Sequence, residues 1–445
     1  MQMLIEENSG RPDTQLRAGS VGWLRLAGLG VSFVIAGHFS GWNLGLAYGG
    51  WGGLALATAV AFIMYLALLF TLGTMVALAP GAGGGATFVS LALGEGWGTV
   101  AGAAILLEYL AASAVIGLFV KAYVAAFIGI DAYFVILIAF GIFAGLHAAG
   151  AGEALGVLLA MTVVSVLTLV IFWYVGAPHF AIENLRGLAG SGNEGWLPYG
   201  LAGAATAFPF ATAFILAVEG VPMAAEEAAE PHRAVRSAML AALAVLGVSA
   251  ALTLTIAVGG TSAGLLSTTN DPLMVALRIW RPEDPVIPHL INLGALVGLL
   301  ACLFSVIYAS SRQAFSLARD RVLPAALTRV NRRGVPINAI LAVSVIGAAL
   351  AATGQTEGIF IVMVCSAAVS YLVMLAAFPM VGRLGGGAGR ARPQTREWLL
   401  AFVAAAGSLA LLASSFASNP GWSAATLVII ALLSAGTALH RRARA

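Results

Sequence analysis

His38, Glu108 and Glu219 are titratable side chains within the apolar, membrane-length stretches of this 445-residue chain. An ionisable group is expensive inside a bilayer, so each of them is a functional candidate. Two carboxyl groups facing one cavity would suit a small cation, and a carboxylate can also take up a proton. His38 is a third candidate proton carrier because imidazole titrates near neutral pH, although an ordinary structural hydrogen bond explains a histidine there equally well.

Glycine and proline interrupt the helical pattern beside two of these side chains. Residues 37–41 carry glycine at both ends, and a glycine inside a helix costs roughly 1 kcal/mol relative to alanine. Glu219 is followed by Gly220 and Pro222, and proline removes a backbone donor and clashes with the preceding turn. Unpaired backbone groups are tolerated at membrane depth only where they line a cavity or meet a ligand. The two breaks therefore predict the walls of a binding site.

The composition indicates a polytopic membrane protein. Hydrophobic residues make up 60% of the chain and charged residues 9%, against about 25% charged in a soluble domain, and the mean hydropathy is +0.96. The formal charge of +3 is too small to suggest a nucleic-acid partner. Cys302 and Cys365 lie in apolar segments, so we expect them to pack in the core as small apolar side chains. Their surroundings lack the spacing of metal ligands, so we expect neither a metal nor a cofactor.

The elements that must position these groups are apolar segments of roughly 20 residues, long enough for a ~30 Å hydrocarbon core. Twelve segments fit, and an even number places both termini on one side. With the N-terminus inside, only Lys121, Arg186, Arg278 and Arg281 of the 22 lysines and arginines lie outside, so the positive-inside rule puts both termini in the cytoplasm. The predicted spans are 24–46, 52–79, 98–127, 132–148, 153–176, 201–221, 237–260, 288–317, 337–353, 358–380, 398–416 and 422–439.

The two breaks fall in the first and the sixth segments, which are corresponding spans of two five-span halves. Interruptions in corresponding positions indicate an inverted-repeat transporter with its site at the membrane midplane. The predicted organisation is a cytoplasmic N-terminal tail at 1–20, a first repeat at 21–176, a second repeat at 177–380, and two accessory spans with a cytoplasmic tail at 381–445.

Three motifs resemble the amino acid–polyamine–organocation superfamily of secondary transporters. They are Phe39-Ser-Gly41 in the first span, Pro80-Gly-Ala-Gly-Gly84 after the second, and YASSRQAFSLARDRVLP at 308–324 closing the eighth. The resemblance covers nearly the whole chain. It implies an all-α membrane protein of 12 transmembrane helices with the LeuT-like 5+5 inverted repeat, helices 1 and 6 broken, and a substrate held between the breaks. Within the superfamily, residues 37–50, 107–109 and 219–228 are most similar to the bacterial ethanolamine permeases.

The candidate site follows from the breaks, the acids and this resemblance. Unwound carbonyls near Gly37 and Ala217 would bind an ammonium group, and the amides of Ser40 and Gly41 would face a carboxylate or hydroxyl. Aromatic faces would add cation–π contacts. The predicted substrate-binding residues are Gly37, His38, Phe39, Ser40, Gly41, Glu108, Tyr109, Phe214, Ala217 and Glu219, and Glu219, Glu108 and His38 are the candidates for proton coupling or gating.

The function predicted from these observations is import of a small organic amine, ethanolamine first, by alternating access across a bacterial inner membrane. Coupling to protons and exchange both stay open. The alternative is a neutral or cationic amino acid transporter of the same fold; a Glu108 that faces the cavity would favour a carboxylate-free amine. An enzyme is not expected, because the six histidines lie in separate segments and lack ligand spacing.

Overall fold

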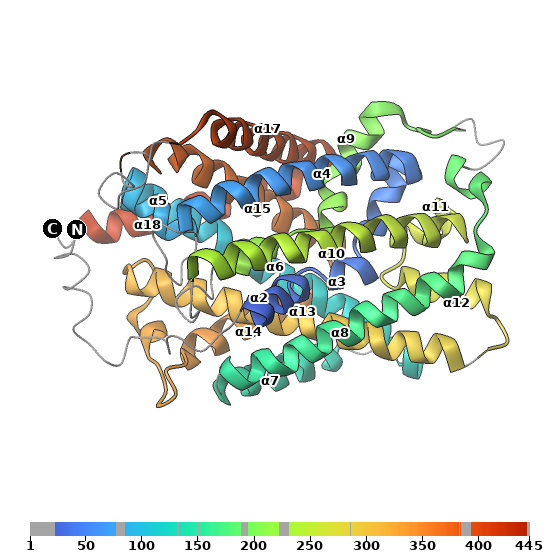
Figure 1. Cartoon of the computed structure of the whole chain (residues 1–445). Helices are drawn as coiled ribbons and strands as arrows, with labels where there is room; N and C mark the ends of the chain where they lie inside the picture. Colours follow the sequence, from blue (N-terminus) through green and yellow to red (C-terminus); the bar gives the residue numbers. More distant parts are fainter. Residues whose placement is uncertain are drawn as a thin grey trace.

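The computed structural model describes residues 23–76, 85–130, 133–149, 151–187, 195–221, 231–284, 286–381, 383 and 393–442, and their regular structure is helical (Figure 1). In chain order, with η for 3₁₀ helices, the elements are α2 (Trp23–Ser32), α3 (Ala36–Phe39), η2 (Trp42–Gly45), α4 (Leu46–Val76), α5 (Gly85–Leu93), α6 (Glu95–Ile128), α7 (Phe134–Ala149), α8 (Ala151–Gly176), η3 (Ala177–His179), η4 (Ile182–Arg186), α9 (Gly200–Ala211), η5 (Thr212–Phe214), α10 (Pro231–Gly259), α11 (Ala263–Leu266), α12 (Pro272–Trp280), α13 (Val286–Arg319), η7 (Ala325–Thr328), α14 (Ile337–Ala351), α15 (Thr356–Ala377), η8 (Phe378–Met380), α17 (Thr395–Ser418) and α18 (Pro420–Arg442).

Among the described residues, eight helices are long and apolar enough to cross a membrane. They are Trp42–Met75, Glu95–Ile128, Gly156–His179, Gly200–Val221, Ser237–Gly259, Val286–Arg319, Thr356–Met380 and Thr395–Ser418. Four shorter apolar helices are Leu26–Phe39, Phe134–Ala148, Ile337–Ala351 and Pro420–Ala435. Each of the twelve predicted segments overlaps one of these helices. The chain is thus an all-helical, multi-pass membrane protein, while the full count of twelve spans stays a prediction because four helices fall short of the ~20 residues that a span needs.

The boundary between the first two predicted spans lies inside α4. Gly50 has φ 61° and ψ −168° there, angles that glycine adopts far more readily than other residues. The kink separates residues 42–49, which continue the first predicted span, from the second span. The first span is therefore divided into short pieces, which is why Leu26–Phe39 alone is too short to cross a bilayer.

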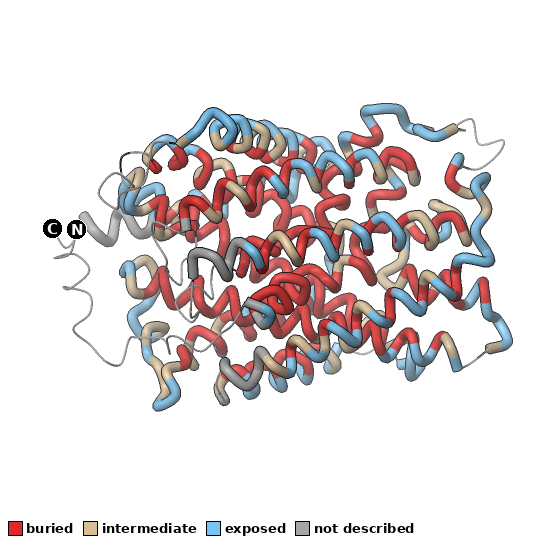
Figure 2. Tube along the Cα trace, in the orientation of Figure 1, coloured by how far each residue is buried: buried red, intermediate tan, exposed pale blue. Residues whose placement is uncertain are grey.

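Helix α6 lies at the centre of the bundle. Every residue of its most apolar stretch is buried, and it contacts α13, α14 and α15. A helix that is apolar all round is expected where neighbours cover every side. Peripheral helices instead expose large apolar side chains, among them Leu137 on α7, Leu167 on α8 and Phe402 on α17, and Figure 2 shows this exposed layer around the buried centre.

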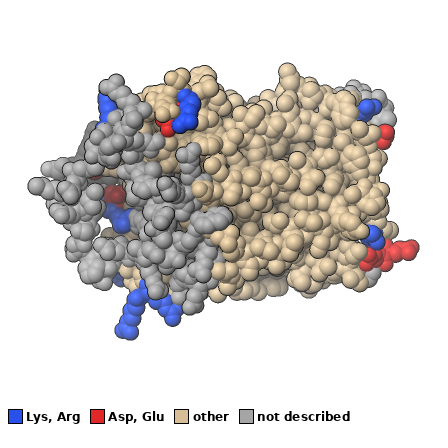
Figure 3. All heavy atoms as spheres, in the orientation of Figure 1, with Lys and Arg blue, Asp and Glu red and all other residues tan. Residues whose placement is uncertain are grey.

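Charged side chains are confined to the two ends of the bundle on the face shown in Figure 3. The band between them carries uncharged residues, which is the pattern of a surface that faces lipid. The glutamates of the candidate site are buried, with 1% (Glu108) and 7% (Glu219) of their surface exposed.

Candidate functional site

The first helix break is longer than the sequence predicted. Residues 33–35 form a turn after α2, whereas Gly37 lies within the single turn of α3. The chain opens again at Ser40, which is extended, and at Gly41, which has φ 97°. One carbonyl that the unwinding releases, that of Phe33, accepts a hydrogen bond from the Cys302 thiol of α13 at 2.9 Å. The break therefore begins before the first glycine because α13 supplies a partner for the freed backbone.

The second break also begins earlier than expected. Helix α9 ends at Ala211, η5 follows, and residues 215–217 form a turn. The Thr212 carbonyl accepts from the amides of Ile215 (2.9 Å) and Leu216 (2.7 Å), and Ala217 has φ 79°. A residue other than glycine held at positive φ is strained, and such strain concentrates at functional sites. Pro222, which the sequence analysis connected with this break, lies outside the described residues.

The two breaks are in direct contact, as the inverted-repeat prediction requires. A Cβ atom placed on Gly37 would lie 1.7 Å from the carbonyl oxygen of Ala213, so only glycine fits at this crossing. Phe214 continues the contact: it stacks on Trp42 with ring centroids 5.7 Å apart and meets the His38 ring edge-on at 5.1 Å.

A cavity of about 40 Å³ lies between the breaks. A single water needs roughly 10–15 Å³ on the same measure, so the space suits a solute of a few non-hydrogen atoms. Of the predicted substrate-binding residues, Gly37, Ser40 and Ala217 line it. The buried hydroxyl of Ser40 has no hydrogen-bond partner among the described residues. The remaining lining residues are mostly apolar: Phe33, Val34, Ala36, Ala112, Val115, Ile116, Phe119, Ala213, Leu216, Cys302, Phe360 and Met363.

The two glutamates form a pair beside this cavity rather than in its wall. Their carboxyl groups are close enough to interact electrostatically. Neither is among the lining residues, so Glu108 does not meet the criterion of facing the cavity that would have favoured a carboxylate-free amine. Glu108 lies one helical turn before Ala112, and Glu219 lies two residues after Ala217. Where two carboxyl groups share a hydrogen bond, one of them carries a proton, because ionised carboxylates only accept. Each glutamate keeps one buried oxygen without a partner in the described part of the chain.

Two tyrosines that the sequence analysis missed complete the acid pair. The Tyr371 hydroxyl of α15 donates to Oε1 of Glu219. The Tyr65 hydroxyl of α4 lies 2.8 Å from that of Tyr371 and donates to it, since the Tyr371 proton is already used. Four segments are thereby joined at one point: α4, α6, α15 and the second break. Hydroxyl groups inside otherwise apolar spans were the only sequence signal for these residues.

His38 has its hydrogen-bond partner on α10. Its Nε2 lies 3.2 Å from the Leu246 carbonyl oxygen of α10, the ring is fully buried, and it is not among the cavity-lining residues. This position favours the structural hydrogen bond, the second of the two interpretations that the sequence left open.

The backbone amides expected to face the substrate already have acceptors. The Ser40 amide donates to the Ala36 carbonyl at 3.1 Å, and the Gly41 amide donates to Oδ1 of Asn43 at 3.0 Å. Asn43, which was not among the predicted site residues, competes for this amide through its side chain. Among the polar side chains of this break that have no partner in the described part of the chain, that of Ser40 lines the cavity and remains for a ligand.

The predicted aromatic residues surround the breaks without lining the cavity. Phe39 is buried and meets Tyr123 edge-on at 6.4 Å, and its carbonyl accepts from the Tyr123 hydroxyl at 2.7 Å. Tyr109 packs on Phe33 with centroids 6.1 Å apart. These rings fix the backbone around the cavity, and the cavity wall itself uses Phe33, Phe119 and Phe360.

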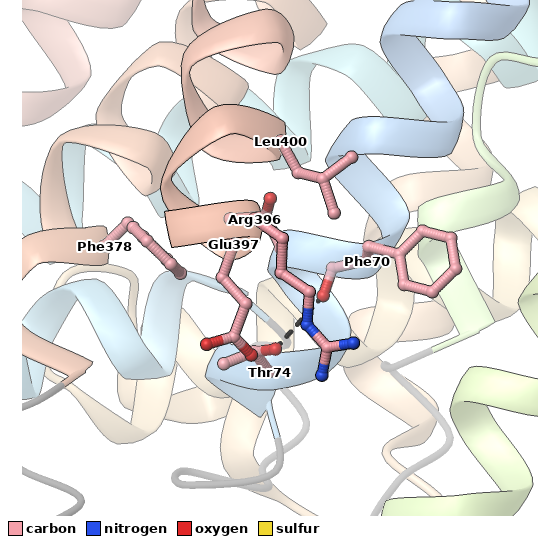
Figure 4. Close-up of a pocket in the computed structure, with 7 residues that line it drawn as sticks. Phe70, Thr74, Phe378, Arg396, Glu397 and Leu400 are labelled. Atoms are coloured by element: carbon pink, nitrogen blue, oxygen red, sulfur yellow. Dashed lines mark hydrogen bonds between the residues drawn. The ribbon is translucent and has the colours of Figure 1, made fainter. Parts of the chain in front are cut away.

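A larger cavity of about 140 Å³ lies elsewhere, between the end of α4 and the start of α17 (Figure 4). Its lining includes Thr74, Arg396, Glu397 and Leu400. Arg396 is exposed, and no residue of either helix break takes part, so its size does not make it the transport site. Within the described residues, no three His, Cys, Asp or Glu side chains are grouped closely enough to hold a metal ion.

Comparison with known families decides the class of protein. The amino acid permease family matches residues 26–382. The chain belongs to the amino acid permease family. Membership identifies this permease as a small-molecule transporter rather than an enzyme and implies the LeuT-like fold, so the superfamily resemblance is confirmed at this coarser level.

Individual relatives are more distant. This permease is 29% identical over 178 residues to a probable GABA permease of Pseudomonas aeruginosa, covering 39% of this chain and 36% of the relative. It is 27% identical over 191 residues to the aromatic amino acid transport protein AroP of Escherichia coli, covering 40% and 39%. An uncharacterized transporter of Mycobacterium tuberculosis is 29% identical over 316 residues, covering 70% and 69%. This permease thus spans little more than a third of the two relatives named for a substrate, and none of the three names refers to ethanolamine.

Proposed function

We propose that this permease imports a small primary amine without a carboxylate, ethanolamine first, by alternating access between the two helix breaks. The observation that carries the proposal is the buried, interacting pair of Glu108 and Glu219 beside a cavity of about 40 Å³. A pair that holds one proton carries one negative charge. An ammonium group in the adjacent cavity would neutralise that charge inside the membrane, where isolated charges are expensive.

The polar groups of the cavity support an amine over an amino acid. A carboxylate needs hydrogen-bond donors, and the amides of Ser40 and Gly41 both have acceptors already. The Ser40 hydroxyl is free to bond the hydroxyl of ethanolamine. The cavity of about 40 Å³ has room for a solute as small as ethanolamine.

A small neutral amino acid is the second candidate, and family membership favours it. A zwitterion carries no net charge, so it would leave the acid pair's negative charge uncompensated. A second proton would then have to accompany the substrate. Both candidates would then move one positive charge and respond to the membrane potential, but only the zwitterion, which moves with a proton, would also respond to a pH gradient.

Transport by the purified protein in liposomes tests these alternatives. Uptake of ethanolamine, alanine and 4-aminobutyrate would be measured under an inside-negative potential alone and under a pH gradient alone. We expect uptake of ethanolamine under the potential, and its loss in Glu108→Gln and Glu219→Gln. Glu283→Gln, which alters an exposed loop carboxylate, is the matched control. Uptake of alanine but not ethanolamine, driven by the pH gradient, would transfer the function to the second candidate.

The membrane arrangement is part of the same proposal. We infer twelve spans with both termini in the bacterial cytoplasm, repeats at 21–176 and 177–380, and an accessory region from 381 onward. Support comes from the helix found in each predicted segment. Reporter fusions after residues 130, 187 and 355 would test the sidedness, since each follows the end of a predicted outward-going helix and all three are expected outside.

A further inference from the structure

Asn43 uses its whole side chain to join the first helix break to a distant loop. Its Nδ2 donates to the carbonyl oxygens of Leu266 (2.6 Å) and Thr269 (2.8 Å), and its Oδ1 accepts from the Gly41 amide (3.0 Å). The residue is fully buried. Both amide protons and the carbonyl oxygen thus have partners, and a buried amide so satisfied is costly to displace.

The loop that Asn43 holds is residues 263–271, between α10 and α12. It begins with the short helix α11, which packs against η2 and α4. Its other end reaches a cavity-lining helix, because Asn270 Nδ2 donates to Oγ1 of Thr356 at 3.3 Å, and Thr356 begins α15. The loop therefore bridges the outer part of the first break and the helix that carries Phe360 and Met363 into the cavity wall.

Gly41, whose amide is bonded to the Asn43 side chain, also contacts the cavity wall. A Cβ atom on Gly41 would lie 3.1 Å from Phe360 and 3.3 Å from Phe119, and both rings line the cavity. Any movement of Gly41 away from these rings would have to carry Asn43 with it or break the bond between them.

We propose that Asn43 is a positioning residue that holds loop 263–271 closed over the break, so that access to the cavity from that end of the bundle requires release of its two loop bonds. The bonds to Leu266 and Thr269 are to backbone carbonyls, so the loop sequence is free to vary while the closure depends on the amide of Asn43. This role goes beyond the proposed substrate, because it concerns access and not what is bound.

The chain contains its own reporter for this access. Cys302 lines the cavity, so its alkylation by a membrane-impermeant maleimide measures how often the cavity opens. Cys365 is the other cysteine and lies against α18, with its Sγ 3.8 Å from the Ser423 carbonyl oxygen. A Cys365→Ala background therefore leaves Cys302 as the single thiol.

The experiment compares alkylation rates of Cys302 in liposomes, with maleimide added to either side. From the side of loop 263–271, we expect Asn43→Ala to raise the rate about tenfold. Asn43→Asp should raise it at least as much, because its carboxylate still accepts from the Gly41 amide but cannot donate to the two loop carbonyls. This near-isosteric variant keeps the test available should the alanine variant fail to accumulate.

Asn184→Ala is the matched control. Asn184 also ties a loop to a helix end, through its Nδ2 and the Gly259 carbonyl oxygen at 2.7 Å, but it does not contact either break. Its alkylation rate should equal that of the parent. An unchanged rate in Asn43→Asp would overturn the proposal, since it would reduce Asn43 to a partner of Gly41. An equal increase in Asn184→Ala would also overturn it, because loosening of the loops in general would then explain the effect.

Discussion

Gly37 and Ala213 lie so close that a Cβ atom on the glycine would come within 1.7 Å of the alanine carbonyl oxygen. The atom it would meet is backbone, which cannot rotate away as a side chain can. The crossing of the two breaks is thus set by the absence of a single methyl group. The cavity between the two breaks depends on this close contact of Gly37 with Ala213.

Gly37→Ala should consequently be destabilising and inactive. Overpacking a filled interior costs typically 1–3 kcal/mol, and we expect at least about 2 kcal/mol here because the clash is with backbone. Thermal unfolding of the detergent-purified protein measures this effect. Gly141→Ala is the control, since a Cβ on Gly141 of α7 meets nothing within 4 Å. Equal melting temperatures for the two variants would contradict the crossing as described.

Tyr371→Phe should weaken the acid pair. The variant removes the donor to Glu219 and leaves a buried carboxyl oxygen without it, a loss of about 1.5–3 kcal/mol for a hydrogen bond to a charged group. We expect a lower melting temperature together with transport reduced at least tenfold. Tyr65→Phe removes only the next bond along, so its effect should be smaller. An effect of Tyr65→Phe that matched or exceeded that of Tyr371→Phe would argue against this order.

Ala217 offers a test of backbone strain in the second break. Its φ of 79° lies where an L-residue is disfavoured by roughly 1–2 kcal/mol. Ala217→Gly should therefore be neutral or more stable by up to about 1 kcal/mol, after the added unfolded-state entropy of glycine is counted. Ala217→Val should lose more than about 1 kcal/mol, because β-branched residues tolerate positive φ least. Chemical or thermal denaturation of both variants would show the difference, and the reverse order of stabilities is the contrary result.

Ser40→Ala should affect substrates with a hydroxyl group selectively. The buried Ser40 hydroxyl lines the cavity and has no hydrogen-bond partner in the described part of the chain. One neutral hydrogen bond contributes about 0.5–1.5 kcal/mol, so the KM for ethanolamine should rise about two- to tenfold. Ethylamine, which lacks the hydroxyl, provides the comparison and should be unaffected. A similar rise for both amines would place the hydroxyl contact elsewhere.

Bound substrate should protect Cys302 from thiol reagents. Cys302 lines the cavity with Gly37, Ser40 and Ala217, so a solute there blocks the approach of maleimide. The measurement is the alkylation rate in the Cys365→Ala background with and without ethanolamine, and we expect a several-fold decrease. Taurine, which adds a sulfonate that the cavity offers no free amide to bind, should not protect. Full protection by taurine would mean that the cavity accepts a sulfonate group.

The sequence predicted much of the architecture because bilayer physics restricts it. Segment length, apolar composition and the positions of arginines identified a helix in each of twelve places, and Gly41 marked the first break correctly. The predicted starting points of the breaks were wrong, because the first break begins at Phe33 and the second at Thr212. These limits depend on partners from other helices, such as the Cys302 thiol, which satisfy freed backbone groups and leave no local trace in the sequence.

What the sequence determined by itself is the class of protein: a helical membrane permease with two interrupted spans and two acids at membrane depth. Only the tertiary structure decided how those pieces meet. It brought Glu108 and Glu219 together and added the Tyr371 hydroxyl as a donor to Glu219. It also set the His38 ring against a carbonyl of α10 and bonded the Gly41 amide to the Asn43 side chain. Composition and periodicity determine which segments can form helices in contact with lipid. A hydrogen bond between residues a hundred positions apart depends instead on how the helices pack, which no single segment encodes.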